Sequence, residues 1–221
     1  MNDGISPFLE KVTLLGGGDL SPETVSRLLT YAPNLVVCDG AAEQALAMGH
    51  RPDLVVGDLD SLKPWTRDRL DPATILHVAE QDTTDFDKAL RVIKAPMVLG
   101  AGFMGKRLDH ELACYNALVR RPDTRCILVG EHDICFHCPP VLTLDLVAGD
   151  RVSLFPMREV AVGMTGLEWS FDRLVLAPDG RVGTSNKALG RVTVRPETHG
   201  LLVILPAGSL DAAIEGLSRA G

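Results

Sequence analysis

The stretch Leu54-Val55-Val56-Gly57-Asp58-Leu59-Asp60-Ser61 joins an apolar run to two carboxylates that stand two residues apart. An apolar run without alternation predicts a strand that is buried on both faces, as in a parallel sheet. Gly57 allows a tight turn where this strand ends. In an extended segment, Asp58 and Asp60 would project to the same side and could share a divalent cation. Asp, Gly and Ser also form plain surface turns, so this stretch alone leaves both readings open.

Short apolar runs alternate with helical patterns through the first two-thirds of the chain. We expect strands at 12–15, 35–38, 54–56, 75–78, 97–99 and 126–129, and helices at 22–31, 41–48, 85–94 and 108–120. This alternation predicts an α/β fold with a mostly parallel sheet flanked by helices. Open sheets of this kind bind ligands at the carboxyl ends of their strands, where the polar and glycine-rich segments collect.

The pattern changes near Pro139-Pro140. Short strands are expected after it, at 141–146, 151–155, 168–176, 190–195 and 201–205, and a helix at 210–218. Many short strands separated by turns predict a small all-β sandwich. We therefore expect an α/β domain over residues 1–139 and a smaller β-sandwich domain over residues 140–221.

The composition excludes several classes of function. The net charge is −7 and the pI is about 5.3, so the chain lacks the basic surface that non-specific nucleic-acid binding requires. No apolar segment is long enough to span a bilayer, and residues 1–11 show no signal-peptide pattern. Five unevenly spaced cysteines favour reduced thiols in a cytoplasmic protein.

A second acidic segment, Gln81-Asp82-Thr83-Thr84-Asp85-Phe86-Asp87-Lys88, opens a helical pattern. Asp82 and Asp85 can face one direction, and Lys88 lies further along the same stripe. Helix capping by Asp82 or Thr84 would explain one or two of these acids. Several acidic clusters at expected strand ends indicate instead a hard cation, normally Mg²⁺, with a phosphate-bearing substrate beyond it.

Two further segments fall at the same expected edge of the sheet. Asp39-Gly40 follows a strand, and Gly105-Lys106-Arg107-Leu108-Asp109-His110 follows a glycine-rich turn and opens a helix. Such a turn can offer N–H groups to a phosphate, and Arg107 can bind one through two hydrogen bonds, while Asp109 could simply cap the helix. Gly16-Gly17-Gly18 could also contact phosphate, although no Gly-Lys-Ser/Thr follows it.

Taken in order, these segments resemble the thiamin pyrophosphokinase (thiamin diphosphokinase) family. The resemblance is spread over most of the chain and is carried by Val37-Cys38-Asp39-Gly40-Ala41-Ala42, residues 53–61, residues 81–90, residues 105–110 and Thr184-Ser185-Asn186. The chain departs from the family at Lys106, because a glycine usually precedes the arginine. It departs also at Ala41, where many members have glycine.

The resemblance implies transfer of diphosphate from ATP to the thiamin hydroxyl, which gives thiamin diphosphate and AMP. It implies an α/β domain that binds ATP and Mg²⁺, and a homodimer with thiamin between the subunits. Asp58, Asp60 and Asp85 are expected to hold Mg²⁺, and Asp58 or Asp85 to accept the hydroxyl proton. The expected residues are, for catalysis, Asp58, Asp60, Asp85, Lys88 and Arg107; for ATP and its metal, Asp39, Gln81, Asp82, Asp109 and His110; and for thiamin, Trp169, Ser185 and Asn186. Trp169 could stack on a cationic ring or serve as a core residue.

Three rival functions share the acidic pattern. A diphosphokinase acting on a pterin alcohol would differ mainly in its C-terminal pocket. A Mg²⁺-dependent phosphohydrolase of the haloacid-dehalogenase type would use Asp58 as nucleophile, but its motif usually follows the first strand. A non-catalytic nucleotide-binding module rarely needs so many carboxylates. A zinc site at Cys135-Phe136-His137-Cys138 is disfavoured because no second ligand pair accompanies it.

Overall fold

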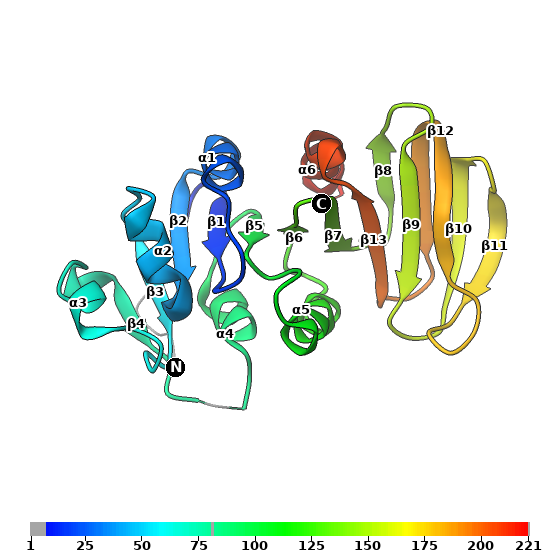
Figure 1. Cartoon of the computed structure of the whole chain (residues 1–221). Helices are drawn as coiled ribbons and strands as arrows, with labels where there is room; N and C mark the ends of the chain where they lie inside the picture. The colour runs from blue at the N-terminus through cyan, green and yellow to red at the C-terminus, as the bar shows by residue number, and fades with distance from the viewer. Residues whose placement is uncertain (1–7, 81, 221) are drawn as a thin grey trace. The chain divides into compact units, whose positions relative to one another are not determined.

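The computed structural model describes residues 8–80 and 82–220, and the chain divides into two compact units between Ala117 and Leu118 (Figure 1). Across this described part of the chain, no helix is both long enough and apolar enough to cross a membrane. The first unit is an α/β structure and the second is mainly antiparallel β structure. This confirms the fold class that was predicted from the sequence.

The first unit contains a parallel sheet with strand order β5-β1-β2-β3-β4. Its elements are β1 (Val12–Leu15), α1 (Pro22–Tyr31), β2 (Asn34–Cys38), the 3₁₀ turn η1 (Asp39–Ala41), α2 (Ala42–Ala47), β3 (Leu54–Gly57), α3 (Pro64–Arg67), η2 (Pro72–Thr74), β4 (Ile75–His77), α4 (Asp85–Val92), β5 (Val98–Ala101) and α5 (Leu108–Arg120), which runs past the division between the units. Every residue of β1, β3 and β5 is buried, as expected for strands covered on both faces.

The direction of the chain across this sheet reverses beside β1. The chain passes from β1 through β2 and β3 to β4, and then returns to the other side of β1 as β5. The loops that follow β1 and β5 lie at this reversal, which is the place where open α/β sheets bind ligands. Backbone hydrogen bonds hold the two loops together, from Gly16 N–H to Ala101 O at 2.8 Å and from Gly18 N–H to Gly102 O at 2.9 Å.

The second unit is built from antiparallel strands in the order β6-β7-β13-β9-β12-β10-β11, with β8 also paired to β12. Its elements are β6 (Cys126–Val129), β7 (Asp133–His137), β8 (Leu142–Asp145), β9 (Arg151–Pro156), β10 (Val160–Leu167), β11 (Phe171–Leu176), β12 (Gly183–Pro196), β13 (Leu201–Pro206), the 3₁₀ turn η3 (Ala207–Ser209) and α6 (Leu210–Arg219). The long strand β12 pairs with β9 near its start and with β8 and β10 near its end, so it links two sheets.

The antiparallel region is larger than we expected. β6 pairs with β7, and β7 pairs with β13, so these two strands belong with the C-terminal strands although they precede residue 139. The sequence pattern also missed β10 and the first half of β12. The glycines of β10 weaken its strand pattern in the sequence. Gly166 is needed there, because it adopts φ +77° and a Cβ atom would come within 2.0 Å of the carbonyl oxygen of Arg191. Glycine at such an irregularity lowers the β propensity of the segment.

A buried histidine makes the stability of the second unit sensitive to acid. The His137 Nε2 atom is 3.1 Å from the N–H of Gly200, which donates to it, and burial lowers the pKa of His137 from 6.5 to about 4, with His199 adding to the effect. Because this pKa is lower in the folded state, the free energy of unfolding should fall by about 3 kcal/mol as the pH drops from 7 to 4. Urea titrations of the wild type and of His137→Gln should show that the substitution removes this loss. His132→Gln, at an exposed position, should keep it.

Candidate nucleotide and metal site

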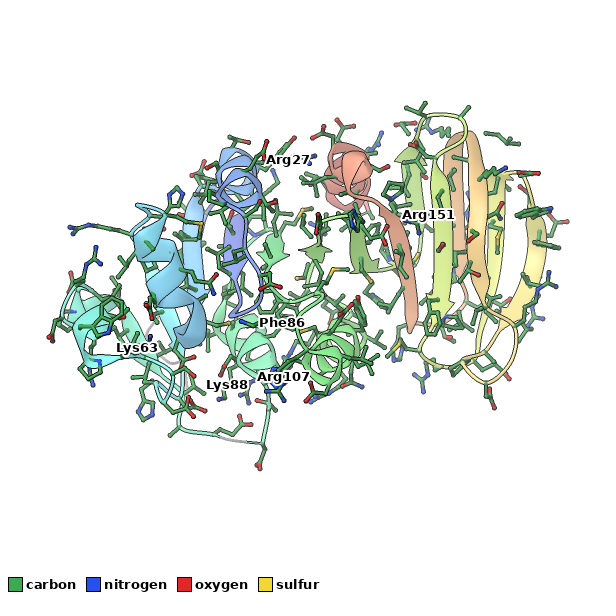
Figure 2. The ribbon with its side chains drawn as sticks, viewed as in Figure 1. Arg27, Lys63, Phe86, Lys88, Arg107 and Arg151 are labelled. Atoms are coloured by element: carbon green, nitrogen blue, oxygen red, sulfur yellow. The ribbon has the colours of Figure 1, made fainter. Side chains whose placement is uncertain are left out.

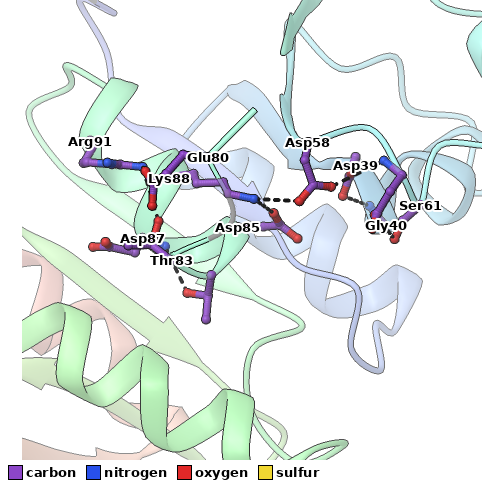
Figure 3. Close-up of polar contacts among 12 residues, drawn as sticks. Asp39, Gly40, Asp58, Ser61, Glu80, Thr83, Asp85, Asp87, Lys88 and Arg91 are labelled. Atoms are coloured by element: carbon purple, nitrogen blue, oxygen red, sulfur yellow. Dashed lines mark hydrogen bonds and ion pairs between the residues drawn. The ribbon is translucent and has the colours of Figure 1, made fainter. Parts of the chain in front are cut away.

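Three carboxylates meet at the carboxyl ends of two neighbouring strands, and Figure 3 shows two of them, Asp39 and Asp58. Asp39 follows β2 directly, and Asp58 and Asp60 follow β3. Each residue offers one oxygen, and these oxygens all lie within 4.8 Å of one another. Parallel pairing of β2 with β3 brings the two segments together although they are far apart in sequence. An arrangement of clustered carboxylate oxygens suits a hard divalent cation.

Asp39 is the least exposed of the three, with 2% of its surface accessible. Its Oδ1 atom accepts a hydrogen bond of 2.7 Å from the N–H of Gly40, whereas its Oδ2 atom is buried and has no hydrogen-bond partner in the described part of the chain. Burial raises the pKa of Asp39, and the negative charge of Asp85 raises it further. A buried carboxylate oxygen without a donor is costly, so a bound cation would relieve an unsatisfied group.

The turn that carries Asp58 and Asp60 is bent, which corrects our expectation of an extended segment. Leu59 between them adopts φ +66°, a conformation that residues other than glycine seldom adopt. The N–H of Asp60 lies 3.4 Å from Asp58 Oδ1, so the bend folds the two acids toward each other. Gly57 is required just before the bend, because a Cβ atom there would come within 2.6 Å of Asp39 Cγ. Backbone strain of this kind is often found at functional sites.

Lys88 neutralises two carboxylates beside this cluster. Its side chain is 2% exposed, and its Nζ atom donates to Asp58 Oδ2 at 2.9 Å and to Asp85 Oδ1 at 3.1 Å (Figure 3). Burial acts to lower the pKa of Lys88, but the hydrogen bonds to Asp58 and Asp85 outweigh it and raise the pKa. The same hydrogen bond from Lys88 lowers the pKa of Asp58. These shifts favour the charged forms of both Lys88 and Asp58.

The helix α4 sets the position of Lys88. Thr84 is its N-cap and accepts a hydrogen bond of 3.3 Å from the N–H of Asp87. This confirms one of the two capping alternatives. Asp82 is exposed and precedes the helix. Gln81 lies outside the described residues.

A cavity of about 480 Å³ lies beside the loops that follow β1 and β5. Its lining comes from the glycine segment after β1, from the ends of β2 and β5, and from the turns before α4 and α5: Gly16, Gly17, Gly18, Cys38, Gly40, Glu43, Ser61, Lys63, Thr84, Asp85, Phe86, Gly102, Phe103, Met104, Lys106, Arg107, His110 and Cys114. Figure 2 shows Lys63, Phe86, Lys88 and Arg107 toward one end of the parallel sheet and Arg27 toward the other. A cavity of this size and location fits a small ligand.

The structure brings three of the residues predicted for catalysis or nucleotide binding to this cavity. Asp85, Arg107 and His110 line it. Asp109 lies in the first turn of α5 and binds Arg107, with 2.6 Å between its Oδ2 atom and Arg107 Nη2. Both side chains of this pair are largely exposed, so a phosphate could displace Asp109 from Arg107.

Sequence reasoning missed the aromatic wall of the cavity. The rings of Phe86 and Phe103 lie 4.7 Å apart and are tilted by 54°. Their positions, 17 residues apart in the chain, carry no local signal that would pair them. The strain at Leu59 and the steric role of Gly57 could not be foreseen from residue types either.

The predicted thiamin residues belong to the second unit. Asn186 is buried, and its side chain makes two hydrogen bonds to the backbone of Trp169. Its Oδ1 atom accepts from the Trp169 N–H at 3.1 Å, and its Nδ2 atom donates to the Trp169 carbonyl oxygen at 2.8 Å. The Trp169 residue is 53% exposed, which rules out the alternative that it is a core tryptophan. Ser185 adopts φ +62°, and its N–H donates to Ser153 Oγ at 3.0 Å.

Comparison with known proteins identifies the family. Residues 25–128 match the family model described as thiamin pyrophosphokinase, catalytic domain. This segment, just under half of the chain, is thus similar to the catalytic domain of thiamin pyrophosphokinases. This confirms the resemblance seen in the sequence motifs. The matched segment contains the acidic cluster of Asp39, Asp58 and Asp60, together with Lys88 and Arg107.

Relatives with the same name extend the similarity along the chain. Thiamine pyrophosphokinase 1 of Arabidopsis thaliana is 30% identical over 165 residues, which cover 65% of this chain and 62% of that protein, so the match spans less than two-thirds of its length. Thiamine pyrophosphokinase 2 of Oryza sativa subsp. japonica is 26% identical over 199 residues, which cover 75% of this chain and 74% of that protein.

Solved structures of thiamin pyrophosphokinases share the fold. The enzyme from Candida albicans has a TM-score of 0.76 at 15% identity, covering 90% of this chain and 89% of that one. The enzyme from Bacillus subtilis has a TM-score of 0.73 at 20% identity, and the match covers 89% of this chain and 98% of that one. At these identities the likeness establishes the architecture, an α/β sheet together with an antiparallel β region.

Proposed function

We propose that this protein is an ATP-dependent diphosphotransferase that converts thiamin and ATP to thiamin diphosphate and AMP. The observation that carries the proposal is the cluster of Asp39, Asp58 and Asp60, beside a cavity at the reversal point of the sheet. Within the described chain, the buried Oδ2 atom of Asp39 has no hydrogen-bond partner. The similarity of residues 25–128 to the thiamin pyrophosphokinase family supports thiamin as the acceptor. A pterin-alcohol diphosphokinase, a phosphohydrolase and a regulatory module find no comparable support.

Mg²⁺ fits the acidic cluster, because the available donors are carboxylate oxygens. Asp39 also has a buried oxygen that accepts no hydrogen bond from the described residues. Asp39, Asp58 and Asp60 would hold the ion. When bound, Mg²⁺ supplies positive charge that stabilises the phosphate oxygens during transfer. Asp85, which we expected among the ligands from the sequence, is paired to Lys88, and we assign it a different role.

The residues around the cavity can orient the nucleotide. The glycine segment 16–18 allows close approach of a phosphate chain to the backbone, and Arg107 offers a planar pair of donors. Lys88 fixes Asp58 and Asp85, since it binds one oxygen of each. Positioning and electrostatic stabilisation are the main demands of phosphoryl-type transfer, so this set of residues suits the chemistry.

The acceptor hydroxyl must lose a proton as it attacks the β-phosphorus of ATP. The lowered pKa of Asp58 keeps that carboxylate ionised, which suits a metal ligand better than a proton acceptor. Asp85 lines the cavity, and we assign the proton to its carboxylate. AMP then leaves with the bridging oxygen, and the new bond joins the thiamin oxygen to the transferred diphosphate.

We assign thiamin binding to Trp169, with Asn186 as the residue that holds its backbone in place. An exposed indole can stack on a flat cationic ring. Trp65 provides a matched control, because it is the second tryptophan of the chain and is 47% exposed in the other unit. In Trp65→Phe, added thiamin should quench the remaining fluorescence, and in Trp169→Phe it should not. Equal quenching in both variants would refute the assignment.

The oligomeric state is proposed from the family resemblance, and the cellular location from the state of the thiols. We propose a homodimer in which both subunits contribute to the thiamin site, and sedimentation analysis tests the dimer. We also propose a cytoplasmic protein, because all five cysteines are buried and form no disulfide, as is common in reducing compartments.

The activity is tested by incubating the protein with Mg²⁺, ATP and thiamin and separating the nucleotide products. The proposal predicts AMP and thiamin diphosphate in equal amounts, and neither product without thiamin. ADP with thiamin monophosphate would indicate transfer of a single phosphate. Phosphate release that is independent of thiamin would indicate a hydrolase, and product formation only with a pterin alcohol would change the acceptor.

A further inference from the structure

Lys106 is distinguished among the basic side chains of the cavity by its partner. Lys63 is paired with Glu43 at 2.8 Å, and Arg107 with Asp109 at 2.6 Å. Lys106 lines the same cavity. Within the described chain, its Nζ atom donates a hydrogen bond to an uncharged group, the carbonyl oxygen of Gly17 at 3.3 Å. A lysine held by a long hydrogen bond to a carbonyl exchanges it readily for an anionic oxygen, because charge-assisted hydrogen bonds are stronger.

The position of Lys106 is fixed from the side of α5. Gly105 before it has φ +100°, and its N–H donates to Glu111 Oε2 at 2.8 Å. The other carboxylate oxygen of Glu111 accepts a hydrogen bond of 2.6 Å from the hydroxyl of Tyr115. One oxygen of Glu111 thus ties the turn to α5, while Tyr115 of the same helix holds the other oxygen. This holds the lysine backbone while its flexible side chain reaches across to the segment after β1.

The Nζ atom of Lys106 therefore lies on the side of the cavity that leads to the acidic cluster. A Cβ atom on Gly17 would be 3.6 Å from the carbonyl carbon of Gly40, and one on Gly40 would be 3.8 Å from Ser61 Cβ. Gly40 follows Asp39 directly, so the carbonyl that binds Lys106 belongs to a segment that packs beside the expected metal ligands. A polyphosphate that extends from the cavity toward those carboxylates would pass this lysine.

We propose that Lys106 binds the polyphosphate of the nucleotide in place of the Gly17 carbonyl, and that it thereby distinguishes nucleoside triphosphates from monophosphates. The inference rests on the proposed function, since it takes ATP as the ligand and AMP as the product. A monophosphate lacks the phosphates that reach Lys106, so the lysine returns to Gly17 when AMP remains. This residue then favours substrate binding without strengthening the binding of the nucleotide product.

Calorimetric titration with Mg²⁺ and α,β-methylene-ATP, which resists diphosphate transfer, and separately with AMP, tests the inference on the full chain. Lys106→Met should weaken binding of the triphosphate analogue about tenfold and change binding of AMP less than twofold. Lys106→Arg should stay close to the wild type. Lys94→Met, an exposed lysine outside the cavity, should leave both affinities unchanged.

Unchanged affinity for the triphosphate analogue in Lys106→Met would overturn the inference, and so would an equal loss for both nucleotides. Either result leaves the proposed function standing if the wild type binds the analogue and forms AMP. A wild-type protein that binds neither nucleotide would overturn the proposed function, and this inference with it.

Discussion

Replacing Asp39 with asparagine is expected to lower Mg²⁺-dependent AMP formation by about 100- to 1000-fold. Asparagine keeps the size of the side chain and can keep the hydrogen bond from the N–H of Gly40, but it removes the buried negative charge that faces Asp58 and Asp60. Initial rates of AMP formation at saturating thiamin and a series of Mg²⁺ concentrations measure the effect. We expect the loss to persist at high Mg²⁺, because an amide is a poor substitute for the missing charge.

The stability of the same variant separates a functional role from a structural one. The pKa of Asp39 is raised in the folded state, so its ionised form disfavours folding above that pKa. Without Mg²⁺ at pH 7, Asp39→Asn should therefore be at least as stable as the wild type. Asp87→Asn serves as a control, since Asp87 is also buried but lies outside the acidic cluster, and it should keep near-normal turnover. Normal turnover in Asp39→Asn would contradict the assignment of Asp39.

Replacing Lys88 with methionine is expected to destabilise the fold by about 3 kcal/mol. The substitution removes the buried cation and leaves the carboxylates of Asp58 and Asp85 without their shared partner. Urea denaturation at pH 7 measures the change in the free energy of unfolding. Because the hydrogen bonds raise the pKa of Lys88 above 10.5, the wild type keeps this contribution at neutral pH and loses it only in stronger alkali.

A second substitution tests the cause of this loss. Adding Asp85→Asn to Lys88→Met removes one of the two unpaired charges, so the double variant should recover part of the lost stability. Lys94→Met, at an exposed position just after α4, should change the free energy of unfolding by less than about 0.5 kcal/mol. If Lys88→Met were as stable as the wild type, the ion pairs seen in the structure would contribute nothing to folding.

The α/β unit was largely predictable because its local signals agree with its tertiary structure. Ser21 and Pro22 predicted the start of α1, and Ser21 Oγ does accept from the N–H of Thr24 at 3.0 Å. The unbroken apolar run at 54–56 predicted a strand buried on both faces, and β3 is fully buried. The second unit was less predictable, because β10 and β12 contain glycines at irregular pairings that interrupt the alternating pattern.

The candidate site was predictable as a region but not as a set of contacts. Motif spacing placed Asp58, Asp60 and Asp85 at one edge of the sheet. It could not show that Lys88 binds Asp85, or that Asp39, which follows a neighbouring strand, lies close to the other two acids. Those relations depend on the pairing of β2 with β3 and on the bend at Leu59, which residue types alone do not specify.

The central claim is that Asp39, Asp58 and Asp60 together bind one divalent cation, and Mn²⁺ binding measured by electron paramagnetic resonance tests it most directly. Titrations of the wild type, Asp39→Asn and Asp85→Asn in the presence of α,β-methylene-ATP allow the comparison. We predict one bound Mn²⁺ per chain in the wild type and in Asp85→Asn, and at least a tenfold weaker affinity in Asp39→Asn. Unchanged Mn²⁺ affinity in Asp39→Asn, with the loss in Asp85→Asn instead, would contradict the account.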